Sequence, residues 1–130
     1  MNKPPQLYHG GRRLQQVLEP RQAVGFGGEG DCQRAVYAVA HRDWAIPFAL
    51  TLVPASQQAV FSVDIDVSPP RIRLKETAVR WKEAGYLYTL PSETFQRIDD
   101  HQWVSYEPVR PLRVDIITPE DYRHWIEFIE

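Results

Sequence analysis

Apolar and polar residues alternate along several short stretches of the chain, a pattern typical of β-strands with one buried face. Residues 60–67 show it most clearly, because Phe61 and Val63 fall on one face while Asp64 and Asp66 fall on the other. The two aspartates are therefore interpreted as solvated side chains rather than metal ligands. Further strands are predicted where apolar, aromatic and β-branched residues gather, at 7–9, 35–40, 71–74, 85–90, 103–107 and 112–117.

Helical patterns are fewer and shorter. Asp43 is expected to cap a helix over 44–52, in which Pro47 is tolerated in the first turn. Apolar positions in 12–20 predict one weak helical turn that a proline ends. Residues 118–129 begin with Thr-Pro-Glu-Asp, which is typical of a capped helix start, and predict a terminal helix.

These elements amount to about seven short strands and two or three short helices, which predicts an α+β domain with a mainly antiparallel sheet. Eleven prolines favour short strands and turns over a helical bundle. A chain of 130 residues is the size of one domain, and its polar residues 1–5 are expected to be loose. Four glycines within 24–31 predict a flexible loop whose spacing matches no phosphate-binding fingerprint.

Charge and cysteine content exclude several classes of protein. Fifteen basic and seventeen acidic residues are well mixed, which argues against a dedicated nucleic-acid-binding module. The single cysteine, Cys32, excludes an internal disulfide framework, and His41, His101 and His124 have no ligand spacing, so no metal is expected. The sequence has neither a signal-peptide core nor an apolar run near the ~18 residues of a membrane span. A cytoplasmic protein without membrane contact is therefore expected.

Three short motifs follow one another in a specific order. His9-Gly10 ends the first predicted strand, Tyr37 lies in a later strand, and Phe48 follows it by eleven residues. Together with Gln-Trp-Val-Ser-Tyr at 102–106, they resemble the ADP-ribosyltransferase fold in its poly(ADP-ribose) polymerase and diphtheria-toxin branch. The third motif of that branch is Glu-aromatic-aliphatic-x-Tyr. Gln102 therefore stands where that branch usually has its catalytic glutamate.

The resemblance implies a single domain over residues 1–130 with a split, mainly antiparallel β-sheet, and it implies NAD as a co-substrate. The nicotinamide would lie between the aromatic faces of Tyr37 and Phe48. Its carboxamide would pair with the backbone of Gly10, where no Cβ obstructs the approach. His9 would hydrogen-bond the hydroxyls of the adjacent ribose.

The same resemblance extends the expected site along residues 11–13. Gly11 completes a glycine pair that lets the backbone approach a ligand closely, and Arg12 and Arg13 could bind the pyrophosphate. In that branch the glycosidic bond breaks through an oxocarbenium-like transition state, which a nearby carboxylate stabilises. Gln102 can bond a ribose hydroxyl, but it carries no charge.

Gln102 leaves three interpretations open. The chain is a weaker mono-ADP-ribosyltransferase or NAD glycohydrolase that releases nicotinamide, or a ligand-recognition domain without catalysis, or an enzyme whose catalytic role has moved to Glu107. Glu107 lies at an odd offset from Gln102, so alternation places the two side chains on opposite strand faces.

Other possibilities are also open. RNA 2′-phosphotransfer, a further activity of this fold, does not depend on the glutamate, and Arg12 and Arg13 would then bind a substrate phosphate. The acceptor is unspecified between protein, nucleic acid, small molecule and water, as is any regulatory partner protein. If the resemblance is accidental, His9, Tyr37 and Phe48 are ordinary packing residues.

Overall fold

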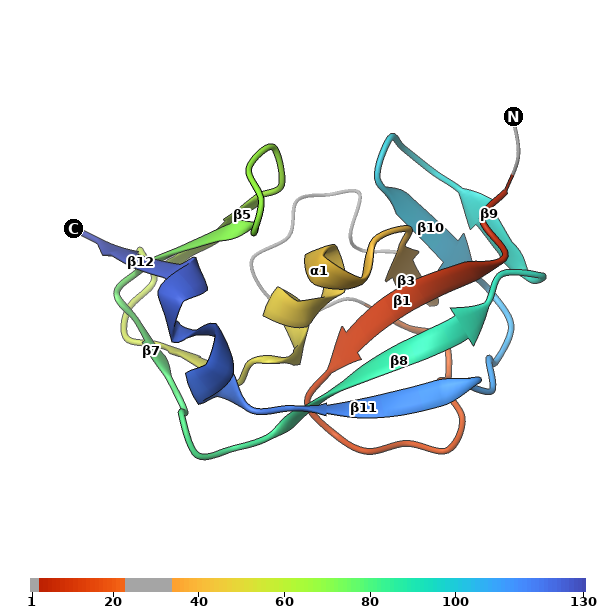
Figure 1. The fold of residues 1–130 in the computed structure, drawn as a ribbon, viewed down its shortest axis with the longest axis horizontal. Helices are drawn as coiled ribbons and strands as arrows, with labels where there is room; N and C mark the ends of the chain where they lie inside the picture. The colour runs from red at the N-terminus through yellow and green to blue at the C-terminus, as the bar shows by residue number, and fades with distance from the viewer. Residues whose placement is uncertain (1–2, 23–33) are drawn as a thin grey trace.

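Antiparallel strand pairing dominates the computed structural model, which describes residues 3–22 and 34–130 (Figure 1). The largest sheet has seven strands. They are β1 (Gln6–Gly11), β2 (Arg21–Gln22), β3 (Arg34–Val39), β8 (Gly85–Pro91), β9 (Phe95–Arg97), β10 (Gln102–Ser105) and β11 (Arg113–Ile117). Their order is β11-β8-β1-β3-β10-β9, with β2 paired beside β3. The predicted α+β class with a mainly antiparallel sheet is confirmed.

The large sheet is divided between β1 and β3. β1 pairs with β8 over its whole length, from Gln6 opposite Pro91 to Gly11 opposite Tyr86. Over the described residues, β1 and β3 share only one pair, Tyr8 opposite Val39. The sheet therefore consists of two well-paired halves, β11-β8-β1 and β3-β10-β9, that meet at a single pair of residues.

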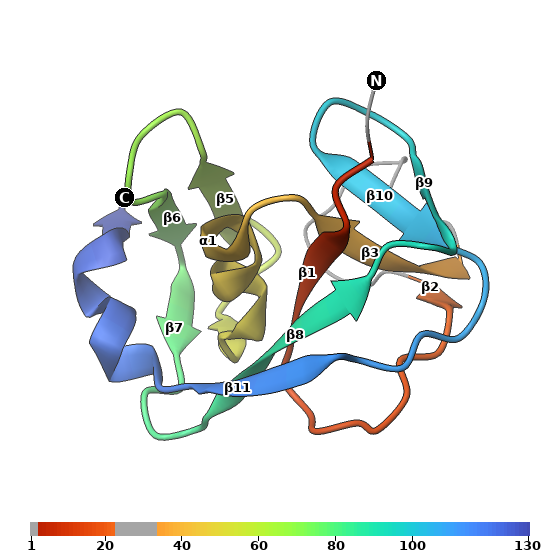
Figure 2. The same cartoon turned by 45° about the vertical axis from the view of Figure 1, so that its right-hand side comes forward.

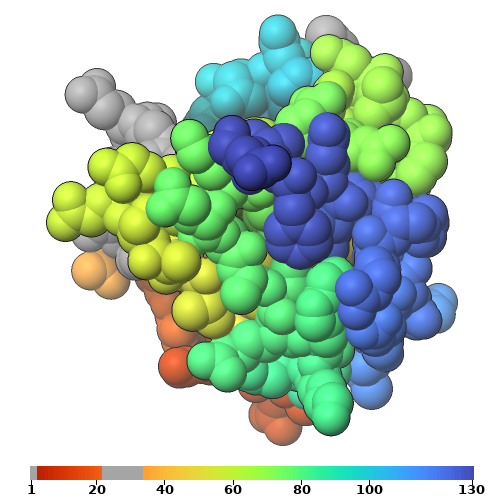
Figure 3. Space-filling view, turned by 90° about the vertical axis from the view of Figure 1, so that its left-hand side faces the viewer, coloured from red at the N-terminus to blue at the C-terminus, as the bar shows by residue number. Residues whose placement is uncertain are grey.

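Two smaller sheets complete the strand content of the described residues. A three-stranded sheet contains β5 (Val60–Asp64), β6 (Arg71–Lys75) and β12 (Ile126–Ile129), and a two-stranded sheet pairs β4 (Leu52–Pro54) with β7 (Thr77–Val79). Figure 3 shows the face on which the C-terminal residues, in dark blue, pack beside the green segments of the chain.

The helix after β3 is shorter than predicted. It begins at Arg42 rather than beyond Asp43, with His41 at the N-cap and no side-chain cap bond. The α-helix α1 (Arg42–Ala45) continues as a 3₁₀ helix η2 (Ile46–Ala49). Pro47 explains the change, because it has no N–H to donate to the carbonyl four residues earlier.

Two further helix predictions are wrong, the terminal one only beyond Trp125, because Thr118 is its N-cap and Pro119 begins it as predicted. The terminal helix is a 3₁₀ helix η3 (Pro119–Trp125), and the chain then becomes strand β12 because residues 126–129 pair in parallel with β6. Residues 12–20 form no helix, since Leu18 and Val109 exchange two backbone hydrogen bonds of 2.8 Å. In both segments a pairing with distant residues replaces the local helical bonds.

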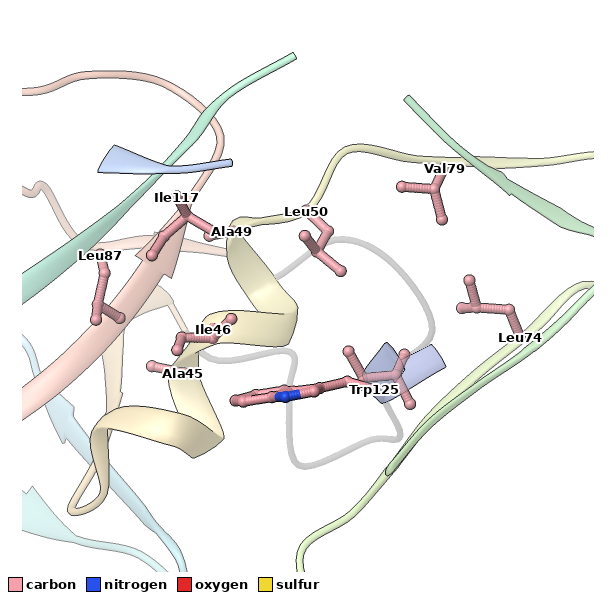
Figure 4. Close-up of a cluster of buried hydrophobic side chains, with 10 residues drawn as sticks. Ala45, Ile46, Ala49, Leu50, Leu74, Val79, Leu87, Ile117 and Trp125 are labelled. Carbon is pink, nitrogen blue, oxygen red and sulfur yellow. The ribbon is translucent and has the colours of Figure 1, made fainter. Parts of the chain in front are cut away.

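Two hydrophobic clusters cover the two faces of the large sheet. One surrounds α1 and η2 and joins Leu87 and Ile117 of the large sheet to Leu74 of β6 (Figure 4). Ile72 of β6 belongs to the same cluster. The helix lies between the large sheet and the three-stranded sheet in both ribbon views (Figures 1 and 2). The other cluster contains Leu7, Leu18, Val36, Ala38, Tyr88, Leu90, Phe95 and Val109. Because both faces are covered, β8 is buried along nearly its whole length.

The N-terminal segment is attached to the end of β8. The Lys3 ammonium donates to the carbonyl of Ser92 at 3.0 Å, and the Ser92 amide donates to the carbonyl of Pro5 at 3.3 Å. Residues 1–2 and the predicted glycine-rich loop at 24–31 lie outside the described residues. Within the part of the chain that the structure describes, no helix has the length and apolarity to span a bilayer.

Candidate functional site

His9 bridges the two halves of the large sheet where they separate. It follows Tyr8, the residue that forms the single β1–β3 pair. Its Nδ1 lies 2.6 Å from the main-chain oxygen of Tyr37 on β3. Its ring also packs beside Tyr88 of β8, with ring centroids 5.9 Å apart. The imidazole is thereby held against both neighbouring strands.

This contact defines the protonation state of His9. A carbonyl oxygen only accepts hydrogen bonds, so Nδ1 must carry the proton and donate it to Tyr37. Burial lowers the pKa of His9 below its ordinary value of 6.5, and the bond to Tyr37 opposes that shift only in part. The ring is therefore neutral at pH 7, and its Nε2 carries a lone pair that can accept a hydrogen bond.

Gly10 is required by the packing of the helix. A β-carbon at this position would overlap the carbonyl oxygen of Ala45 and would lie 2.9 Å from the amide nitrogen of Ala49. Gly11 is less confined, since a β-carbon there would meet only side-chain atoms, the nearest being Cε2 of Tyr88 at 3.4 Å. Packing against the helix is therefore enough to explain the glycine at position 10, but not the glycine at position 11.

Arg12 and Arg13 lie just beyond β1, and both side chains are exposed. Tyr88 fixes the course of this segment. Its hydroxyl donates to the carbonyl of Arg13 at 2.6 Å and accepts from the amide of Gln15 at 2.9 Å. Burial raises the pKa of the Tyr88 hydroxyl, which therefore keeps the proton that it donates.

Tyr37 and Phe48 occupy different environments. Tyr37 is half-buried in the middle of β3, opposite Val104 of β10. Phe48 is 52% exposed on η2, and its ring packs edge-on against Phe61 of β5 with centroids 5.5 Å apart. Since Phe48 contributes little to the core, its exposed ring is available for contact with a ligand.

Gln102 begins β10 on the face of the sheet that α1 covers. It pairs with Val39, which in turn pairs with Tyr8, and residues directly opposite each other share a face. Tyr8 and Val39 both pack against the cluster around α1. His9 has the opposite parity, and its cross-strand partner Tyr88 belongs to the other cluster. Strand alternation therefore directs Gln102 and His9 to opposite faces.

Glu107 lies beyond the end of β10, in a bend rather than in the strand. The buried hydroxyl of Ser105 donates to the carbonyl of Glu107 at 2.9 Å and accepts from its amide at 3.2 Å. Thr94 must then donate to Ser105 in their 2.7 Å contact, because the Ser105 proton is already used. Ser105 pairs with Val36 while Gln102 pairs with Val39, so Glu107 follows the end of β10 farther from the β1–β3 pair.

An aromatic group next to Gln102 in the structure was not predicted from the sequence. Trp44 of α1 contacts the rings of His41 and His101 edge-on, with centroid distances of 4.1 Å and 5.4 Å. The spacing of His41 and Trp44 indicates one helical turn. The contact with His101 arises from the tertiary structure alone and connects the start of β10 to α1.

Other surface features lie apart from these residues. One open depression of about 640 Å³ is lined by Asp64, Arg73 and residues 67–71 and 124–127, and another of about 510 Å³ by Val53 and residues 78–83. Neither contains a residue of the expected NAD site. Across residues 3–22 and 34–130, no three His, Cys, Asp or Glu side chains are grouped to hold a metal ion.

Comparison with known proteins adds no assignment: no protein-family model, no curated protein and no solved structure matches this chain.

Proposed function

We propose that this chain binds NAD in the gap between β1 and β3, in the manner of ADP-ribosyltransferase-like domains. The observation that carries the proposal is the separation of these strands beyond the Tyr8–Val39 pair. Among the described residues, Gly10 and Gly11 pair with β8 on one side and with no strand on the β3 side. A free strand edge offers N–H and C=O groups with which a carboxamide can pair.

His9 supports the proposal through its fixed tautomer. With Nδ1 donating to Tyr37, Nε2 is an acceptor for a ribose hydroxyl that lies in the gap. Phe48 supports it through its exposure, because a half-exposed ring on η2 can stack on a nicotinamide without any loss of core packing. Arg12 and Arg13 supply positive charge at the end of β1 for the pyrophosphate.

These residues favour the binding of NAD over its rapid cleavage. Cleavage of the nicotinamide bond develops positive charge on the ribose, and Gln102 has no negative charge to stabilise it. Glu107 follows the far end of β10, which makes it the less favoured candidate for that role. We therefore expect NAD binding with slow nicotinamide release, and transfer to an acceptor only as a mono-ADP-ribosyl step.

The test is calorimetric titration of the purified chain with NAD, followed by mass spectrometry of the same sample for free nicotinamide. Phe48→Ala should weaken NAD binding by about tenfold, which corresponds to ~1.4 kcal/mol. Phe128→Ala is the matched control, because Phe128 on β12 is also an exposed phenylalanine. Absence of binding to the unmodified chain would overturn the proposal, as would equal affinities for the two variants.

A further inference from the structure

β11 forms one end of the large sheet and presents an apolar row to solvent. It pairs with β8 and is the terminal strand of the order β11-β8-β1-β3-β10-β9. Val114 is 38% exposed, Ile116 is 70% exposed, and Leu112, just before the strand, is 59% exposed. The alternating residues Arg113 and Asp115 project to the other face, where Arg113 Nε donates to Asp115 Oδ1 at 2.9 Å.

An exposed edge strand of this kind is a template for pairing with another strand. Natural edge strands are commonly protected by charged side chains, prolines or bulges. Here every second residue from 112 to 116 is apolar and exposed. This arrangement fits an occupant whose strand is apolar on one face and charged on the other.

We propose that the occupant is β11 of a second copy of this chain, paired antiparallel about a two-fold axis through Val114. In this register Leu112 faces Ile116 of the other copy, Val114 faces its own equivalent, and Arg113 faces Asp115. All exposed apolar side chains then share one face, and two Arg–Asp pairs of opposite charge share the other.

Neighbouring registers lack this complementarity. A two-fold axis through Asp115 places two aspartates opposite each other, and an axis through Arg113 places two arginines opposite each other. A shift by one residue opposes apolar side chains to charged ones, because alternation has a period of two. The sequence of β11 thus selects a single self-complementary register.

The side chain of Asp115 is already surrounded by positive charge. Besides its bond to Arg113, its Oδ2 lies 4.0 Å from the guanidinium of Arg42 on α1. In the dimer the facing Arg113 adds a third cation to this carboxylate, which is 23% exposed in the single chain. The new ion pairs therefore form at a site that is partly shielded from water, and a charge pair is stronger at such a site than on an open surface.

The dimer would leave the proposed NAD site accessible. β11 is separated from β1 by β8, so the pairing adds strands at one edge and does not close the gap between β1 and β3. The two proposals thus rest on different observations, and each can fail without the other.

Sedimentation equilibrium of the full chain tests the proposal. Two short strands bury less than the standard interface of about 1,600 Å², so we expect a weak dimer that dissociates between about 10 and about 1,000 µM. Val114→Lys, which brings two lysines together at the axis, should abolish the dimer. Ile98→Lys is the control, because it removes an exposed apolar side chain beyond β9, at the other end of the sheet. A monomer at every concentration overturns the proposal, as does a dimer that survives Val114→Lys.

Charge exchange tests the register. Arg113→Asp alone places an aspartate opposite Asp115 at both equivalent positions of the dimer. It should raise the dissociation constant by about tenfold. The double variant R113D/D115R restores two pairs of opposite charge and should recover the dimer. If R113D alone does not weaken association, the register is wrong.

A cross-link provides a measurement that does not depend on these charges. Val114→Cys, in a chain whose only native cysteine is changed by Cys32→Ser, should form a disulfide-linked dimer on mild oxidation. The same change at Ile98 should remain monomeric. Equal cross-linking at the two positions contradicts the proposed axis.

Discussion

The backbone of α1 lies so close to β1 that the carbonyl oxygen of Ala45 occupies the place of a β-carbon on Gly10. Both partners are main chain, so neither can move away by changing a side-chain rotamer. The close approach joins the helix to the strand that also carries His9. The helix also contacts β3. The position of α1 against the two halves of the sheet thus depends on the absence of a side chain at residue 10.

Gly10→Ala should therefore destabilise the fold strongly. Relief of the overlap needs a backbone shift of α1 or β1, and we expect a loss of about 3 kcal/mol in the free energy of unfolding. Gly11→Ala is the matched control, since its β-carbon meets Tyr88 Cε2 at 3.4 Å, an ordinary contact, and should change stability by less than about 1 kcal/mol. Urea denaturation measures both. Equal effects would show that α1 does not confine residue 10.

Removal of the Tyr88 hydroxyl should loosen the segment after β1. Tyr88→Phe leaves the carbonyl of Arg13 and the amide of Gln15 without their partner, at a cost of about 1 kcal/mol. The specific readout is amide hydrogen exchange, which should accelerate at Gln15. Tyr86→Phe is the control and should leave the Gln15 amide unchanged.

Stability should fall as the pH is lowered through the titration of His9. The pKa of His9 is lowered in the folded chain, so below about 6.5 the unfolded state binds the proton first. The contribution of the neutral ring is complete above pH 6.5 and is lost as the pH falls through the folded pKa.

Urea unfolding at pH 7.5 and 5.5 measures this dependence. His9→Asn keeps a donor for Tyr37 but does not titrate, and it should reduce the pH dependence, whereas His124→Asn should retain it. Long-range nitrogen–proton NMR should also report the Nδ1–H tautomer for His9 at pH 7.5. An Nε2–H tautomer there would contradict the bond to Tyr37.

Gln102→Glu tests whether the missing carboxylate limits turnover. Gln102 lies on the face that α1 covers and His9 lies on the other, so a gain in turnover requires the ribose to reach the α1 face. The substitution keeps the size of the side chain and adds a negative charge, so NAD affinity should change by less than about threefold while nicotinamide release rises by about 100-fold. Mass spectrometry of nicotinamide over time measures the gain. Gln96→Glu on β9 is the control with the same change in charge. If Q102E binds NAD but releases no more nicotinamide, the chain is a binding domain.

Strand positions were largely predictable because they depend on local alternation. Val60–Asp64 and Gly85–Pro91 fall where period-two and aromatic patterns placed them. Residues 126–129 were predicted as helix, since Ile126 and Ile129 have helical spacing. They form a strand instead, because their partners lie more than 50 residues earlier, in β6.

The strands that carry the candidate residues were partly predictable, but the spatial arrangement of those residues was not. The sequence pattern placed Tyr37 on a strand, and only the resemblance placed Gln102 at the start of one; the structure has Tyr37 in β3 and Gln102 as the first residue of β10. The sequence could not show that Gly10 packs against Ala45, or that Trp44 contacts His101, because these contacts join segments far apart in the chain. Local propensity contains no information about such partners.

Among the described residues, Tyr8–Val39 is the one strand pair that joins the two halves of the large sheet, so a turn of one half against the other would pivot there. Neighbouring strands are about 4.8 Å apart, so β11 lies roughly 10 Å from β1. A turn of about 10° at the Tyr8–Val39 pair would then displace β11 by about 2 Å relative to β3. A molecule that widened the gap beside His9 by such a turn would therefore also change the orientation of β11 at the outer edge of the sheet.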